Sequence, residues 1–94
     1  MQLYNITYEP EANEDIRQIS SWYEACKEGL GKEFRNEVRE RIEEILTKNP
    51  KIRQIVYKNQ RHLSLKRFPH KIVFLVDETN QNVQIIAIIH PKQN

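Results

Sequence analysis

The side chains best suited to bind an anion lie between Arg61 and Lys71, in the segment RHLSLKRFPHK. This segment has no acidic residue, and its basic and imidazole side chains are Arg61, His62, Lys66, Arg67, His70 and Lys71. Lysine and arginine neutralise phosphates, and the nearby aromatic residues Tyr57 and Phe68 can stack on a base. The pattern predicts a surface for an anionic partner, either nucleic acid or an acidic protein segment. A strand edge protected from aggregation by lysines gives the same pattern, so both interpretations stay open.

Acid–base chemistry is the second activity that these residue types allow. Imidazoles exchange protons near neutral pH, and RNA cleavage through the 2′-hydroxyl needs a base, an acid and a cation for the charged intermediate. His90, His70 and Arg67 supply these three types, so they are the catalytic candidates if the chain is a ribonuclease. In the simpler alternative, His70 is a turn residue and His90 only ends a strand.

Metal and cofactor sites are not indicated. The histidines and most acids lie in different parts of the chain, and there is no paired-cysteine spacing and no glycine-rich phosphate loop. We therefore expect no metal and no cofactor. Cys26 is the single cysteine, so no internal disulfide can form, and we interpret it as a small apolar residue on a helix.

Charge is divided unevenly along the chain, although the net charge is only +2. Residues 1–46 hold six Lys/Arg against eleven Asp/Glu, whereas residues 47–94 hold nine against two. A basic second half favours an anionic or acidic partner. No apolar stretch approaches the roughly 20 residues of a membrane span, so we expect a cytoplasmic protein that does not enter membranes.

The pattern of apolar residues predicts a strand, two helices and then further strands. Leu3–Glu9 alternates as a strand, and Pro10 ends it. Apolar residues at three- and four-residue spacing predict helices at Glu11–Glu28 and Gly31–Lys48, joined as an antiparallel hairpin. Their apolar stripes are Ala12, Ile16, Ile19, Tyr23 and Cys26 on the first helix and Phe34, Val38, Ile42 and Ile45 on the second.

The second half reads as extended chain. Arg53–Lys58 is a short extended piece, and strands follow at Arg61–Phe68, His70–Glu78 and Val83–His90. We predict one α+β domain over residues 1–94 with the order β-α-α-β-β-β. Its antiparallel sheet includes the N-terminal strand, and the helix hairpin packs on one face. The last two strands are apolar on both faces, so the other face needs a cover or a partner.

Several stretches in the same order resemble the RelE/ParE superfamily of bacterial type II toxins, also called plasmid-stabilisation proteins. They are YEPEANEDIRQISSWYE, GLGKEFRNEVRERIEEI, RFPHKI at Arg67–Ile72 and IIAIIH at Ile85–His90. The resemblance spans essentially the whole chain. It implies a sheet braced by a helical hairpin, and a cognate antitoxin whose binding residues on this chain are not assigned.

The resemblance implies one of two toxic activities. ParE-like members bind DNA gyrase and are not nucleases, whereas RelE-like members enter the ribosome and cut mRNA without a metal. RFPHKI resembles the ParE branch more, and the tyrosine that many RelE-like members carry near the C-terminus is absent, since no tyrosine follows Tyr57. If the chain is RelE-like, the resemblance implies that His90 is the catalytic group near the C-terminus.

Three hypotheses therefore stand. In the first, the chain is a gyrase-binding toxin that contacts its target through Arg61, Lys66, Arg67 and Lys71, with His70 beside them. In the second, it is a ribosome-dependent ribonuclease that uses His90, His70 and Arg67. In the third, it is an interaction module without toxicity. Whether the chain is an enzyme, and whether it forms a homodimer, stay open at this stage.

Overall fold

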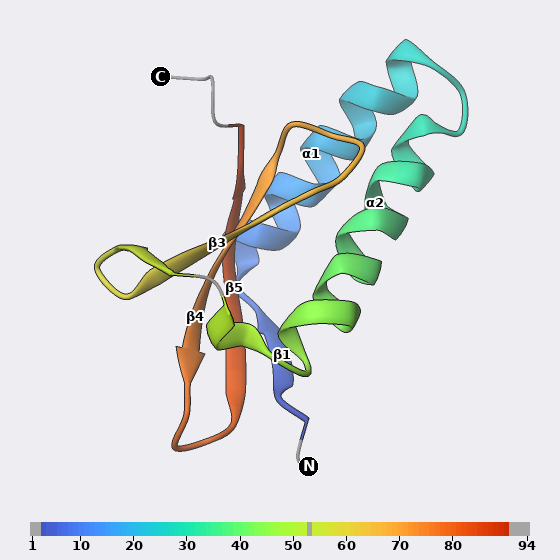
Figure 1. Ribbon diagram of the computed structural model, residues 1–94. Helices are drawn as coiled ribbons and strands as arrows, with labels where there is room; N and C mark the ends of the chain where they lie inside the picture. The colour runs from blue at the N-terminus through green and yellow to red at the C-terminus, as the bar shows by residue number, and fades with distance from the viewer. Residues whose placement is uncertain (1–2, 53, 91–94) are drawn as a thin grey trace.

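A computed structural model describes residues 3–52 and 54–90, apart from the side chain of Ile52. Arg53, at which the short extended piece was predicted to begin, lies outside the described residues. The order of elements confirms the predicted α+β class (Figure 1). The elements are β1 (Asn5–Tyr8), α1 (Pro10–Cys26), α2 (Leu30–Arg41), a π-helical turn (Ile42–Leu46), a 3-10 turn (Pro50–Ile52), β2 (Ile55–Tyr57), β3 (Gln60–Ser64), β4 (Lys71–Asp77) and β5 (Asn82–Ile89).

The sheet is mixed rather than antiparallel throughout. Its strand order is β1-β5-β4-β3-β2, and β2 to β5 form the predicted antiparallel meander. β1, however, runs parallel to β5, with Asn5 opposite Asn82 and Tyr8 opposite Ile85. The prediction of a purely antiparallel sheet was wrong on this point. Side chains alternate with period two in either pairing, so the sequence pattern of β1 carries no information about its direction.

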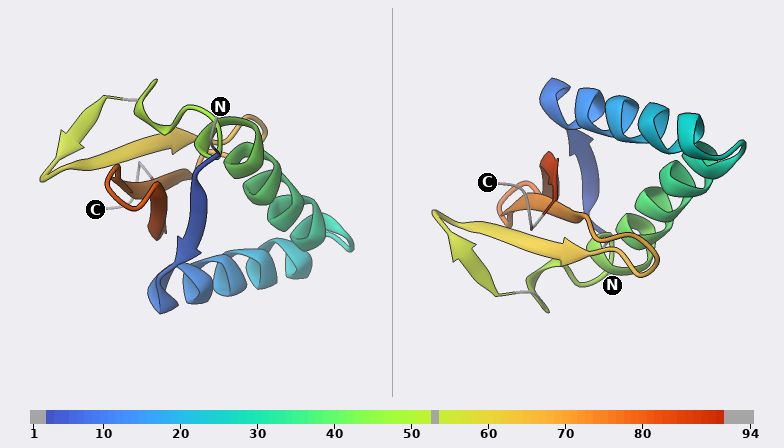
Figure 2. Two further views of the ribbon diagram at one scale, coloured as in Figure 1. Left: turned by 90° about the horizontal axis from the view of Figure 1, so that it is seen from below. Right: turned by 90° about the horizontal axis from the view of Figure 1, so that it is seen from above.

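Both helices lie on one side of the sheet, and the β2–β3 hairpin extends away from them (Figure 2). α1 begins with Pro10, whose missing N–H is not needed in a first helical turn. Its stripe packs on the core as predicted, except for Cys26. That residue is exposed because the last turn of α1 forms the tip of the hairpin, away from the sheet (Figure 1), so its interpretation as an apolar filler was wrong.

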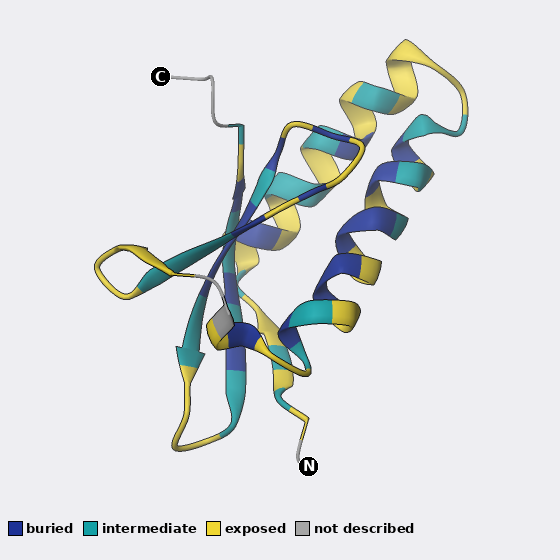
Figure 3. Cartoon of the chain, viewed as in Figure 1, coloured by how far each residue is buried: buried dark blue, intermediate teal, exposed yellow. Residues whose placement is uncertain are grey.

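The two helices approach each other closely at Gly31. A Cβ atom there would lie 2.4 Å from the backbone oxygen of Ser20 on α1, so only glycine permits this spacing. Gly29, by contrast, has open space around it and a φ of 87°, which glycine adopts without strain. α2 then buries Phe34 and Val38, and the π-helical turn adds Ile42 and Leu46 (Figure 3).

A β-bulge in β5 changes which of its side chains face the core. Val73 of β4 lies opposite Ala87, but Phe74 lies opposite Ile85, so β5 carries one extra residue between them. The extra residue changes the alternation, and Ile85 and Ile88 both become buried with Phe74 under the helices. No helix among the described residues is long and apolar enough to cross a membrane.

Candidate functional site

The β3–β4 loop, Leu65–His70, is anchored to α2 by a buried carboxylate. Glu37 is only 8% exposed, and it accepts hydrogen bonds from the backbone N–H groups of Lys66 at 2.5 Å and Arg67 at 3.0 Å. The N–H of Leu65 donates to the His70 carbonyl at 3.1 Å, which closes the loop. The loop backbone is therefore fixed by contacts within the chain.

The side chain of Arg67 meets an acid of α2, and that of Lys66 meets an acid of the π-helical turn that follows α2. Arg67 Nη2 lies 2.6 Å from Glu33 Oε1, and Lys66 Nζ lies 3.9 Å from Glu44 Oε2. The hydrogen bond from Arg67 to Glu33 raises the pKa of Arg67 above its ordinary value. These side chains line a hollow of about 290 Å³, the α2 groove, formed by Glu33, Asn36, Glu37, Glu40, Arg41, Glu44, Lys66 and Arg67. Carboxylates balance cations there, so the groove has no excess positive charge.

Neither Arg61 nor Lys71 lines the α2 groove. Arg61 lines a separate open hollow with Lys51, Asp77 and Glu78. Arg61 pairs with the core residue Phe74, so the two side chains lie on the same face of the sheet. Lys71 precedes Phe74 on β4 by three residues, an odd number, so its side chain projects from the opposite face. The structure brings Lys66 and Arg67 to one groove, and it places Arg61 and Lys71 outside that groove, on opposite faces of the sheet. The alternation of residues in the sequence could not reveal these positions. The strand predicted over Arg61–Phe68 ends at Ser64, and Lys66 and Arg67 lie in the loop that follows.

His70 and His90 do come together. Their ring centroids are 5.1 Å apart and nearly perpendicular, and the His70 ring also contacts the rings of Tyr23 and Phe34. His70 is 7% exposed, and its Nδ1 is buried without a hydrogen-bond partner. Burial lowers the pKa of His70 below its ordinary value, and His90 lowers it further. At neutral pH His70 is therefore an uncharged ring in an aromatic cluster.

The histidine pair opens into a cavity of about 700 Å³ between α1 and the end of β5, which we call the α1 groove. Its lining is Asp15, Gln18, Ile19, Trp22, Tyr23, His70, Ile88, Ile89 and His90. Trp22 is 64% exposed. Asp15, Gln18, Ile19 and Trp22 were missed as site residues, although their i, i+3, i+4, i+7 spacing places them on one face of a helix.

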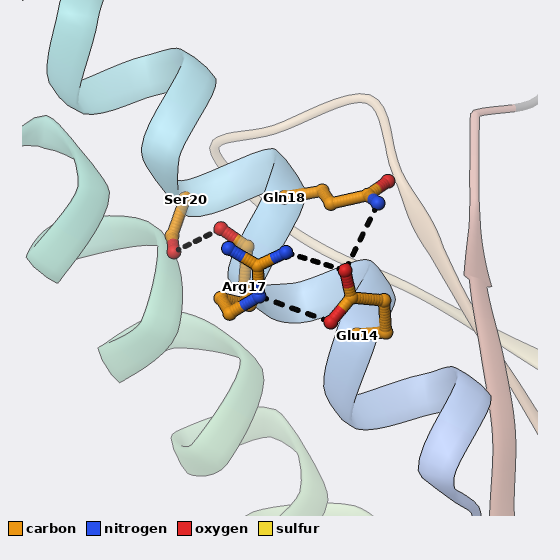
Figure 4. Close-up of polar contacts among 4 residues, drawn as sticks. All are labelled: Glu14, Arg17, Gln18 and Ser20. Carbon is orange, nitrogen blue, oxygen red and sulfur yellow. Dashed lines mark hydrogen bonds and ion pairs between the residues drawn. The ribbon is translucent and has the colours of Figure 1, made fainter.

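Two neighbouring acids of α1 have different roles. Glu14 accepts hydrogen bonds from Arg17 and Gln18 on the helix surface, with Arg17 Nη2 at 2.5 Å and Gln18 Nε2 at 3.0 Å (Figure 4). The Arg17 hydrogen bond lowers the pKa of Glu14. Asp15 instead reaches the sheet, and its Oδ2 accepts the backbone N–H of Ile88 at 3.1 Å. Asp15 is thus the α1 carboxylate that faces β5.

The three catalytic candidates do not share one hollow. His70 and His90 line the α1 groove, whereas Arg67 lines the α2 groove and pairs with Glu33. Within residues 3–52 and 54–90, no group of three or more metal-ligating side chains is gathered in one place.

Comparison with known protein families shows which family the chain belongs to. The family model described as "ParE toxin of type II toxin-antitoxin system, parDE" matches residues 6–94. The chain belongs to this family. It is therefore a toxin of the type II class within the RelE/ParE superfamily, which confirms the resemblance in the sequence. A comparison with curated protein sequences finds no match.

Solved structures show the same fold in other members of the superfamily. A chain of the chromosomal ParDE system from P. aeruginosa is 18% identical, with a TM-score of 0.73 over 93% of this ParE-family toxin and 95% of that chain. A chain of the RelBE2 toxin–antitoxin complex from Mycobacterium tuberculosis is 14% identical, with a TM-score of 0.65 over 94% and 98%. A chain of the intact E. coli RelBE complex is 13% identical, with a TM-score of 0.62 over 96% and 99%.

Proposed function

We propose that this ParE-family toxin arrests growth by binding DNA gyrase and that a cognate antitoxin neutralises it. The observation that carries the proposal is the ParE family match over residues 6–94. The fold by itself is neutral on this point, since both ParDE and RelBE chains share it. A cognate antitoxin is supported by the fact that structural neighbours were solved as toxin–antitoxin complexes.

The electrostatics of the two grooves favour a protein-binding toxin over a nuclease. A cleavage site needs a cation next to the acid and the base. Here Arg67 pairs with Glu33 in one groove, and the uncharged His70 lies in the other. The α2 groove has no surplus of positive charge to hold a phosphate backbone.

The proposed target contact is the tip of the β3–β4 loop, with Lys66 and Arg67 as its cations. Glu37 holds the backbone beneath them, so the two side chains are presented from a fixed loop. Arg61 and Lys71 complete the proposed surface only if the target reaches around the sheet, because they project from other positions.

Controlled expression in bacteria tests the proposal. We expect growth arrest, an SOS response, and inhibition of DNA supercoiling by purified gyrase when the purified toxin is added. The double variant Lys66→Glu, Arg67→Glu should abolish the arrest while its circular dichroism spectrum stays that of the wild type. Arrest without any effect on gyrase contradicts the proposal, and no arrest at all supports a module without toxicity.

A ribosome-dependent ribonuclease is the second candidate, and one observation favours it. His70 and His90 are in ring contact and face an open cavity of about 700 Å³. In that case, mRNA from arrested cells would show cuts at fixed codon positions, and His90→Ala would remove them. Intact mRNA during arrest excludes this candidate.

A further inference from the structure

Two buried charged side chains of α2 contact the backbone where β3 passes into the β3–β4 loop. Glu37 is 8% exposed, and Arg41, about one helical turn later, is 9% exposed. Charged side chains are rarely buried to this extent unless their polar atoms have partners. Both side chains make hydrogen bonds to backbone groups of residues 64–67. Their burial therefore serves the shape of this short segment.

The two side chains bind the backbone on either side of Leu65. Arg41 Nε donates to the Ser64 carbonyl at 3.1 Å. Glu37 Oε2 accepts the N–H groups of both Lys66, at 2.5 Å, and Arg67, at 3.0 Å. Two successive N–H groups that converge on one anion require a turned backbone, because an extended strand alternates its direction from one residue to the next. Glu37 and Arg41 thus impose a turn directly after β3.

This turn decides where the two loop cations lie. Adjacent residues of a strand project to opposite faces, yet Lys66 and Arg67 both line the α2 groove. Their side chains remain 66% and 59% exposed. The inner side of the loop is filled by three buried side chains, Leu65, Phe68 and His70. The turn, rather than the order of residues, therefore brings the two cations to one surface.

We propose that Arg41 and Glu37 are positioning residues for the target contact. They fix the turn that presents Lys66 and Arg67 together, and in this way they set the affinity of the toxin for its target. This inference rests on the proposed function, because it takes gyrase as the target. A loop that already has its binding geometry loses less conformational entropy on binding. The role of Arg41 and Glu37 is thus exerted through the two exposed cations.

A purely structural role predicts a different behaviour of the folded protein. If the two side chains only stabilise the fold, their replacement changes how much protein is folded and leaves the affinity of each folded molecule unchanged. If they position the cations, the folded molecule itself binds more weakly. Thermal unfolding therefore selects a temperature at which every variant is fully folded, and all the measurements below are made there.

A matched pair of variants at Arg41 tests the hydrogen bond at constant charge. Glutamine carries its amide nitrogen the same number of bonds from Cα as arginine Nε, so Arg41→Gln can still donate to Ser64, whereas Arg41→Met cannot. The toxin concentration that half-inhibits supercoiling by purified gyrase should rise about tenfold in Arg41→Met. In Arg41→Gln it should stay within about threefold of the wild type.

An exposed arginine of the same helix provides the control. Arg39 donates to Asn36 on the surface of α2 and does not line the groove. Arg39→Met removes the same charge as Arg41→Met, and it should change the half-inhibiting concentration by less than about threefold. An equal loss in Arg39→Met and Arg41→Met would show that net charge matters rather than the turn, and it would overturn the inference.

The second matched pair is at Glu37 and is read in two ways. Glu37→Gln keeps a carbonyl oxygen for the loop N–H groups, whereas Glu37→Met has no acceptor. Inhibition of gyrase should fall in Glu37→Met and recover in Glu37→Gln. Amide exchange should accelerate at Lys66 and Arg67 in Glu37→Met while the amides of β4 and β5 stay protected. That pattern reports a local loss of the turn in a folded protein.

The outcomes separate this inference from the proposed function. If the wild type inhibits gyrase and the folded methionine variants inhibit it equally well, the positioning role is wrong and the gyrase proposal stands. Glutamine variants as weak as the methionine variants also overturn the positioning role. If the wild type arrests growth without affecting gyrase, the gyrase proposal fails. Arrest that is lost in the methionine variants and recovered in the glutamine variants then supports positioning for another target. A wild type without any arrest overturns both.

Discussion

The α2 groove and the α1 groove are both lined by residues of the β3–β4 loop, yet they differ in how far the chain satisfies its own polar groups. In the α2 groove, Glu37 accepts hydrogen bonds from two loop N–H groups, Glu33 of α2 pairs with Arg67, and Glu44 of the π-helical turn pairs with Lys66. In the α1 groove, the Nδ1 atom of His70 is unpaired and Trp22 is exposed. Buried polar groups are normally paired, so the chain itself satisfies the base of the α2 groove, whereas in the α1 groove a buried polar atom is left without a partner.

The largest expected effect comes from removing the anchor of the loop. Glu37→Ala leaves two backbone N–H groups without their acceptor, and we expect a loss of about 3 kcal/mol in the free energy of unfolding. Chemical denaturation measures it. Glu40→Ala is the control, because Glu40 lines the same groove but is exposed, and it should change stability by less than about 0.5 kcal/mol. Equal effects of the two substitutions would show that the loop is not held by Glu37.

The next effect concerns the spacing of α1 and α2, which sets the position of both grooves. Gly31→Ala forces a methyl group against the Ser20 carbonyl of α1, and we expect a cost of about 2 kcal/mol. Gly29→Ala meets no neighbouring atom and only strains a positive φ, at about 1 kcal/mol. Thermal unfolding of the two variants distinguishes steric from backbone strain. A smaller loss for Gly31→Ala than for Gly29→Ala would contradict the close packing of the helices.

The sequence predicted the elements well and their contacts less well. Spacing alone located the helices and the buried residues Ala12, Phe34 and Val38, because an amphipathic helix must bury one face. The direction of β1 and the bulge in β5 were missed, since both depend on pairing with distant strands. The pairing of Arg67 with Glu33 joins residues 34 positions apart. No local pattern reveals such a contact, so the basic segment looked more available than it is.

The unpaired imidazole predicts a dependence of stability on pH. The folded chain lowers the pKa of His70 below its ordinary value of 6.5, so the unfolded chain binds a proton more readily. Above pH 6.5 His70 is neutral in both states and does not reduce the free energy of unfolding. Below pH 6.5 protonation of the unfolded chain lowers the free energy of unfolding. Burial lowers the pKa of His62 as well, so His62 contributes in the same direction.

Two variants test whether His70 causes this pH dependence. His70→Phe removes the buried Nδ1 and should raise stability by about 1 kcal/mol at pH 7, and it should flatten the fall between pH 7 and pH 5. His62→Gln is the control, and it should leave most of the fall in place. Denaturation at several pH values measures both. An unchanged pH profile in His70→Phe would show that His70 is not the titrating group.

The smallest expected effect tests whether the cations above the loop are free to change partners. The side chains of Arg67 and Glu33 are 59% and 44% exposed, and ion pairs between exposed side chains contribute little to stability. A double-mutant cycle with Arg67→Ala and Glu33→Ala should therefore give only a small coupling energy. A weak pair lets Arg67 leave Glu33 for an acidic group of the target while Glu37 still holds the backbone. A large coupling energy, comparable with that of a buried pair, would make the pair part of the fold, and the proposed target contact at Arg67 would fail.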